Sequence, residues 1–177
     1  MKSRKVHVGI DPGVTGFITV FYQDGKIDSF PMPKIGKEVD LHALNQIFVN
    51  FINNFVLGEI HCVIEDVHAI FGSSAGSNFT FGSINGSLKA FLVAHNIPHT
   101  FVQPKKWQKE MWEGVKLQTK PSSTGKTMKI DTKSMSEIAA KRLFPNIDLR
   151  KSTRASNSDD NKVDSILLAE YSRRKFD

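Results

Sequence analysis

Residues 6–13 read Val6-His7-Val8-Gly9-Ile10-Asp11-Pro12-Gly13, and this stretch decides the fold that we expect. Valine and isoleucine recur at every second position, which is the period of a β-strand, and an acid and a Pro-Gly turn end the strand. A carboxylate at the end of a buried strand is costly unless a positive charge compensates it. The stretch therefore predicts a core strand that delivers Asp11 to a cation site.

The flanking residues predict one α/β domain over residues 1–177, with a mixed five-stranded sheet and helices on both faces. Asp24-Gly25 is a hairpin signal between the second and third strands. A parallel crossover must then join this meander to the fourth strand. The five predicted strands are residues 6–10, 17–22, 26–30, 60–65 and 98–103.

Apolar residues at helical spacing predict the helices, and polar stretches predict the loops between them. Residues 72–77 are rich in Gly and Ser and predict a loop, and Phe79 and Phe81 precede a turn at Gly82. Residues 113–131 and 149–158 are polar and basic, and we expect both to be mobile loops. The first three predicted helices are residues 41–55, a helix marked by Ile84, Leu88, Phe91, Leu92 and His95, and residues 105–112. A fourth begins with a Ser134–Glu137 capping box and ends before Pro145. The last helix is capped by Ser158 or Asn157.

The net positive charge of the chain comes from its second half. The net charge is +6, and residues 101–177 hold 17 Lys or Arg against 10 Asp or Glu, whereas residues 1–100 hold 7 against 8. Clustered positive charge suits a polyanion, although a solvated lysine-rich face has the same composition. The lone Cys62 fits a reducing compartment, and no apolar run is long enough to cross a membrane. We therefore expect a cytoplasmic protein.

Four acids predict a metal site. Asp11 and Glu65 end two strands that would lie side by side if they are parallel neighbours, and Asp160 and Asp164 lie four apart on one face of the last helix. Together they suit two Mg²⁺ ions, which Mn²⁺ can replace, because hard ions prefer carboxylate oxygen. Each acid taken alone also has a structural interpretation: Asp11 can close an Asx turn, and Asp160 can complement the helix dipole.

Three segments resemble the RuvC-like Holliday junction resolvases of the RNase H superfamily. They are Gly9-Ile10-Asp11-Pro12-Gly13-Val14-Thr15-Gly16, then Ile64-Glu65, then the run from Asp160 to Ala169. The resemblance is stronger to the phage, poxvirus and plastid branch than to bacterial RuvC. Its marks are Phe79 and Gly82, Pro104 and Trp107, and Lys133 with the segment that ends at Pro145.

The resemblance implies a magnesium-dependent endonuclease, usually a homodimer, that resolves four-way DNA junctions by paired nicks. A water activated by the metal would attack phosphorus in line and leave 5′-phosphate and 3′-hydroxyl ends. Asp11, Glu65 and Asp164 match the family's metal-binding acids, with Asp11 bridging both ions. For the fourth position Asp160 is favoured over Asn161. Lys133 matches a lysine that approaches the scissile phosphate.

The resemblance also bears on DNA contacts. Bacterial members carry an aromatic wedge three residues after the Glu, where this chain has His68, so Phe71 is the candidate wedge further along the loop. Phe79 is a second candidate for contact with bases. Lysines on nearby loops, Lys105, Lys106 and Lys129 among them, are candidates for contacts with the DNA backbone.

Other functions remain open from the sequence. A protein that binds junctions without cutting them would use the acids structurally, and a flap nuclease or transposase would use the same site on other DNA. The turn from Asp11 to Gly16 also resembles the phosphate loop of actin-like and sugar-kinase-type ATPases, but that fold needs a second lobe. A junction resolvase of viral or phage origin, acting in a host cell, fits all of the features.

Overall fold

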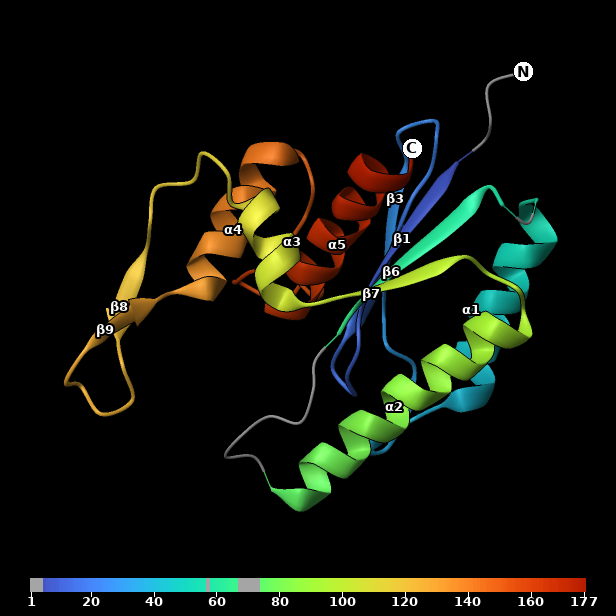
Figure 1. The fold of residues 1–177 in the computed structure, drawn as a ribbon, viewed down its shortest axis with the longest axis horizontal. Helices are drawn as coiled ribbons and strands as arrows, with labels where there is room; N and C mark the ends of the chain where they lie inside the picture. Colours follow the sequence, from blue (N-terminus) through green and yellow to red (C-terminus); the bar gives the residue numbers. More distant parts are fainter. Residues whose placement is uncertain (1–4, 57, 67–73) are drawn as a thin grey trace.

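The computed structural model describes residues 5–56, 58–66 and 74–177. Its centre is a mixed five-stranded sheet in the order β3-β2-β1-β6-β7, in which β1 pairs antiparallel with β2 and parallel with β6 (Figure 1). This is the predicted sheet, with the predicted crossover. The strands are β1 (Val6–Asp11), β2 (Phe17–Phe21), β3 (Ile27–Pro31), β6 (Ile60–Glu65) and β7 (His99–Val102), with two short pairs, β4 (Lys34–Ile35) with β5 (Glu38–Val39) and β8 (Thr119–Pro121) with β9 (Met128–Ile130).

Five helices cover the two faces of the sheet, as expected (Figure 1). α1 and α2 lie on one face, and α3, α4 and α5 lie on the other. Two separate hydrophobic clusters fill the layers between them. The helices are α1 (Leu41–Asn54), α2 (Ala75–Ala94), α3 (Pro104–Met111), α4 (Thr132–Leu143) and α5 (Asp160–Phe176).

The start of α2 differs from the prediction. The helix begins at Ala75, where the Ser74 hydroxyl caps it by accepting a hydrogen bond from the Ser77 amide at 3.1 Å. Half of the predicted Gly/Ser loop is therefore helical, and Gly82 lies inside the helix and not in a turn. Gly and Ser weaken a helix but do not prevent one whose buried side, here Ile84, Leu88 and Leu92, packs on the sheet.

Two helix caps and one loop also differ from the prediction. Asp131 caps α4 in place of the Ser134–Glu137 box, and Asp159 caps α5 in place of Ser158 or Asn157. An aspartate carboxylate is an equally good acceptor for the free amides of a first turn. Residues 119–130 form the β8–β9 hairpin within the segment that was expected to be a loop. Residues 149–158 contain only an isolated bridge between Arg150 and Ser158.

Cys62 is fully buried in β6 and is a free thiol, and its burial raises its pKa. No helix in residues 5–56, 58–66 and 74–177 has both the length and the apolar character of a membrane span.

Candidate metal centre

The site begins where two parallel strands end. Ile10 of β1 is paired with Ile64 of β6, so Asp11 and Glu65, the last residues of these strands, lie next to each other at one edge of the sheet. Side chains alternate along β1, and Ile10 is part of the core under α1 and α2. Asp11 therefore faces the opposite layer, where α5 lies.

Gly9 brings α5 onto β1. A Cβ atom at Gly9 would lie 2.1 Å from the Ser165 carbonyl oxygen and 2.2 Å from the Ala169 amide nitrogen, so only glycine permits this contact between backbones. The Thr19 hydroxyl on β2 is 2.7 Å from the Ser165 hydroxyl and fixes the helix across the sheet. Asp164, the neighbour of Ser165, is thereby carried to the end of β1.

The first turn of α5 is held against the loop that follows β1. The Asn161 side-chain amide donates to the Thr15 carbonyl oxygen at 2.9 Å, and the Asp159 carboxylate accepts from the Asn161 and Lys162 amides, each at 3.1 Å. Between the two alternatives for the fourth ligand, Asn161 is thus engaged in holding the helix. Asp160 lies beside it in the same turn.

Asp11 is at the centre of a group of like charges. Burial raises the pKa of Asp11 well above its usual value, and the charges of Asp164, Glu65 and Asp159 raise it further. Burial also raises the pKa of Glu65, against the effect of the Trp107 indole, which donates to Glu65 Oε1 at 3.0 Å. Carboxylates from β1, β6 and α5 are therefore close enough to repel one another.

Asp164 is the most informative member of this group. Burial raises its pKa to about 7; a hydrogen bond from Ser136 lowers it, the charges of Glu65 and Asp160 raise it, and Lys133 lowers it. Its Oδ1 atom is buried and has no hydrogen-bond donor among the described residues. A buried carboxylate oxygen without a donor is energetically costly, and a cation would remove that cost.

Lys133 reaches the mouth of the site from the first turn of α4. Its ammonium pairs with the Asp160 carboxylate, and the two side chains are 66% and 44% exposed. The hydrogen bond with Asp160 is the main reason that the pKa of Lys133 is raised. The structure therefore brings Lys133 to Asp160, and its approach to a scissile phosphate stays a prediction.

Two side chains of the site were missed as functional by the sequence reasoning. Trp107 is fully buried, and its indole N–H also orients Glu65. Ser136 is buried in α4 and donates to Asp164. Trp107 was among the marks of the resemblance, but nothing in the sequence names Glu65 as the partner of Trp107 or Asp164 as the partner of Ser136.

The donor set fits Mg²⁺ in its chemistry, since all four candidates are carboxylates. The described residues contain no group of three or more His, Cys, Asp or Glu side chains arranged closely enough to hold a metal ion. The charges of Asp164 and Glu65 act on Asp11, and the charge of Asp160 acts on Asp164, without any coordination geometry among the described residues. That the four acids converge on one pair of ions stays a prediction.

The candidate DNA contacts are spread around this site. Phe71 and His68 lie outside the described residues. Phe79 is 79% exposed in the second turn of α2, Lys105 and Lys106 are exposed in the first turn of α3, and Lys129 is exposed on β9. A groove of about 440 Å³ runs from the loop after Asp11 to the first turns of α2, and Gly13, Val14, Ser77, Thr80 and Phe81 are among its lining residues.

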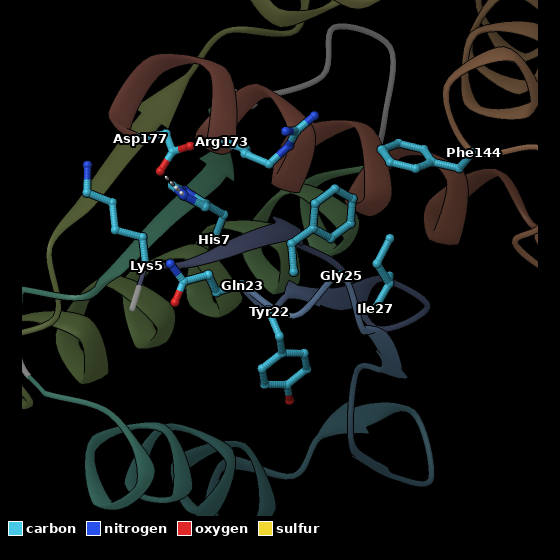
Figure 2. A pocket seen from close by; sticks show the side chains of 10 residues that line it. Lys5, His7, Tyr22, Gln23, Gly25, Ile27, Phe144, Arg173 and Asp177 are labelled. Atoms are coloured by element: carbon cyan, nitrogen blue, oxygen red, sulfur yellow. Dashed lines mark ion pairs between the residues drawn. The ribbon is translucent and has the colours of Figure 1, made fainter. Parts of the chain in front are cut away.

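Another cavity of the described chain is at the other end of the sheet. It has a volume of about 580 Å³ and contains none of the predicted site residues (Figure 2). Lys5, His7 and Arg173 line it, and His7 Nε2 is 3.9 Å from the Asp177 carboxylate. The cavity is therefore separate from the carboxylate site.

Comparisons with known proteins identify the fold. No protein-family model matches the chain, and no curated protein sequence matches it. Among solved structures, it is similar to Thermus thermophilus RuvC in complex with a Holliday junction substrate, with a TM-score of 0.56, 10% identity and 97% of each chain covered. A second Thermus thermophilus RuvC structure gives 0.51 at 14% identity, again over 97% of each chain. The yeast mitochondrial Holliday junction resolvase Ydc2 gives 0.48 at 13% identity, covering 92% of this chain and 75% of that one.

The similarities to the two RuvC structures confirm the predicted fold. The mixed five-stranded sheet with helices on both faces is the RNase H-like fold of RuvC. The resemblance first seen in three short segments therefore extends over nearly the whole chain as a shared fold.

Proposed function

We propose that this RuvC-like fold is a single nuclease domain that resolves four-way DNA junctions with the help of divalent metal ions. The observation that carries the proposal is the meeting of Asp11, Glu65 and Asp164, from β1, β6 and α5, in one electrostatically coupled group. A similar fold, Thermus thermophilus RuvC, has been captured with a Holliday junction. Raised carboxylate pKa values in such a group are typical of sites that need a cation to work.

Asp11, Glu65, Asp164 and Asp160 would hold two Mg²⁺ ions, with Mn²⁺ as a substitute. When bound, the ions supply the Lewis acidity that hydrolysis of a phosphodiester needs. Trp107 and Ser136 hold Glu65 and Asp164 in place by hydrogen bonds from outside the carboxylate group. Hydrolysis would leave 5′-phosphate and 3′-hydroxyl ends.

Lys133 would act on the scissile phosphate. Its ammonium is two-thirds exposed at the mouth of the site and is held there by Asp160. A cation in this position stabilises the negative charge that develops on phosphate oxygens during attack. The exposed lysines of α3 and the groove next to the loop after Asp11 would contact the DNA phosphates on either side of the scissile phosphate.

A homodimer would place two such sites on one junction, as paired nicks require. Ile84, Leu88 and Leu92, on one side of α2, are buried in the core. The opposite side of α2 is exposed, uncharged apart from Lys89, and able to approach a partner closely, because a Cβ atom at Gly82 or Gly86 would meet nothing within 4 Å. Gly82, Ser83, Gly86, Ala90 and Val93 form this surface.

The test is cleavage of four-way, flap and linear DNA of matched sequence, with and without Mg²⁺ or Mn²⁺. We expect paired cuts in the four-way junction only when a divalent metal is present. Asp11→Asn should abolish cleavage while binding to the junction survives. Glu38→Gln, at an exposed acid on β5 that is not among the predicted site residues, is the matched control and should cut normally.

Each contrary result selects a different function. Binding of the junction without cleavage in either metal would identify a junction-binding protein. Preference for flaps would identify a related branch nuclease. Cleavage by the Asp11→Asn variant would exclude this site altogether.

A further inference from the structure

The β8–β9 hairpin follows α3 and precedes α4 in the chain, and it projects from the body of the protein (Figure 1). It is a separate two-stranded sheet and does not pair with the central one. An isolated hairpin is only marginally stable in water, so one that is kept in a folded protein needs an anchor.

The hairpin is anchored to the first turn of α4. The Lys120 ammonium pairs with the Asp131 carboxylate at 2.7 Å, and Asp131 is the cap of α4. The Asp131 amide also donates to the Gln118 carbonyl oxygen at 2.9 Å, which extends the ladder of the hairpin to the helix. Lys133, which pairs with Asp160, lies in the same turn. The hairpin is thus held next to the carboxylate site.

The tip of the hairpin has a defined turn. The Ser122 amide donates to the Thr127 carbonyl oxygen at 2.7 Å, and the Gly125 amide donates to the Ser122 carbonyl oxygen at 2.9 Å. Gly125 has a φ of +71°, which disfavours any residue with a side chain. The tip is therefore shaped by its sequence, and the hairpin can act as a short arm.

The two faces of this arm differ in character. Lys129 is paired with Lys120 on one face, while Met128 is paired with Pro121 and Ile130 with Thr119 on the other. Met128 is 62% exposed and Ile130 is 48% exposed. Neither side chain belongs to a hydrophobic cluster of the described chain. An exposed apolar pair on a projecting arm indicates a contact with something outside the chain.

The charge of the arm indicates DNA as that contact. Lys126 and Lys129 are exposed on the arm, and Asp131 at its base is already paired with Lys120. A second copy of the chain would bring the same positive arm, whereas DNA brings phosphates. An intact duplex shows phosphates but hides the faces of its bases. At a branch point the stacking of bases is interrupted, and apolar side chains can be inserted there.

We propose that the β8–β9 arm reads the branch point, with Met128 and Ile130 against unstacked bases and Lys126 and Lys129 on the flanking phosphates. This inference rests on the proposed function, because it needs branched DNA at the carboxylate site. It adds a source of selectivity to that function. The apolar face prefers branched over linear DNA, and the lysines bind both.

The test is a double variant, Met128→Gln with Ile130→Thr, assayed by fluorescence anisotropy in EDTA on a four-way junction and on a linear duplex of the same arms. We expect affinity for the junction to fall at least about tenfold, since two apolar side chains lose their contacts. Affinity for the duplex should change less than about twofold, which also shows that the variant is folded. Ile35→Gln, at a 69% exposed isoleucine on β4, is the matched control and should leave both affinities unchanged.

A second readout addresses the bases directly. 2-Aminopurine placed at the branch point should change its fluorescence when the unmodified protein binds, and this change should be lost with the double variant. A Lys126→Gln, Lys129→Gln variant should instead weaken binding to both DNAs and reduce the slope of log affinity against log salt by about 1 to 2.

The outcomes separate the two proposals. Equal losses on junction and duplex, or no loss on either, would overturn the reading of the branch point by the apolar face. If the double variant differs from the unmodified protein in its mass by sedimentation while its DNA binding is intact, the apolar face is a contact between copies of the chain. That outcome would also overturn the reading of the branch point. Failure of the unmodified protein to bind any branched DNA would overturn the proposed function itself.

Discussion

The layers that cover the two faces of the central sheet differ in the polarity of their buried side chains. Under α1 and α2 the core is predominantly apolar, with Leu44, Phe48 and Leu88 fully buried. Under α5, apolar residues share the layer with buried polar groups that bond to one another across the sheet. Thr19 bonds to Ser165, and His7 Nδ1 lies 3.1 Å from the Ser172 hydroxyl.

This difference separates stability from chemistry. An apolar face is stabilised by volume and burial, and it tolerates changes that preserve both. A polar face has to satisfy each group with a particular partner, so it fixes the position of every residue on it. Asp11 and Asp164 lie on the polar face, where their positions are fixed. Changes on the two faces should therefore have different consequences.

The largest expected effect is at Gly9, where the two faces are coupled through β1. In Gly9→Val the new side chain would collide with the backbone of α5. We expect a loss of more than about 3 kcal/mol in the free energy of unfolding, or no folded protein. Urea denaturation measures it. Gly82→Ala, in open space on α2, should be neutral or stabilising, and a fully stable Gly9→Val protein would contradict the packing described.

The next effect belongs to the apolar face alone. Leu88→Ala should cost about 2–5 kcal/mol of unfolding free energy, because it leaves a cavity in a fully buried position. The folded fraction should nevertheless cleave junctions at the normal rate per molecule. Active-site titration against the folded fraction provides the measurement, and a fall in the rate per folded molecule would show that the two faces are not independent.

A smaller effect, of opposite sign, is expected on the polar face. Asp164→Asn removes a buried charge whose pKa is raised by burial, so at pH 8 it should increase the unfolding free energy by about 1–2 kcal/mol. Cleavage should be lost at the same time. Chemical denaturation and a cleavage assay on one sample test both effects, with Glu38→Gln as the neutral control. A destabilised variant would mean that the carboxylate is already compensated in the folded protein.

The pH dependence gives a related and more modest effect. The folded pKa of Asp164, about 7, is above its unfolded value, so the penalty for its charge is full above pH 7 and is relieved as the pH falls toward 4. Without divalent metal, the contribution of Asp164 to stability should therefore rise between pH 8 and pH 5. His7 and His61, whose pKa values are lowered by burial, contribute in the opposite direction. The difference in thermal unfolding between the unmodified protein and Asp164→Asn isolates the Asp164 contribution, and it should shift in favour of the unmodified protein as the pH falls.

The smallest change in stability is expected for Lys133→Ala. Its ion pair with Asp160 is exposed, and such pairs contribute less than about 1 kcal/mol. Cleavage should nevertheless slow more than junction binding does. Single-turnover cleavage beside anisotropy separates the two, and equal loss of both would reduce Lys133 to a backbone contact.

The sequence was informative where a short pattern determines a local structure. Alternation in residues 6–13 predicted β1, and the crossover to β6 then placed Asp11 beside Glu65. It was uninformative where the determining partner is distant. Nothing near Gly9 shows that α5 packs against it, and nothing near Trp107 shows that its indole meets Glu65.

The errors in helix and loop boundaries have a physical cause of a different kind. Ser74, Asp131 and Asp159 all cap helices, but caps of similar quality stood nearby in the sequence. The hairpin at 119–130 has strands of three residues each, too short for a periodic signal. Its apolar side chains are exposed, so a search for a core passes over them.

Cys62 gives the chain an internal reporter. It is the only thiol in the sequence, and it lies fully buried on β6 between β1 and β7. A thiol reagent can reach it only when the centre of the sheet opens, so the rate of its alkylation measures that opening without any added label. The same burial means that a cysteine introduced on the surface would be the only one to react in the folded protein.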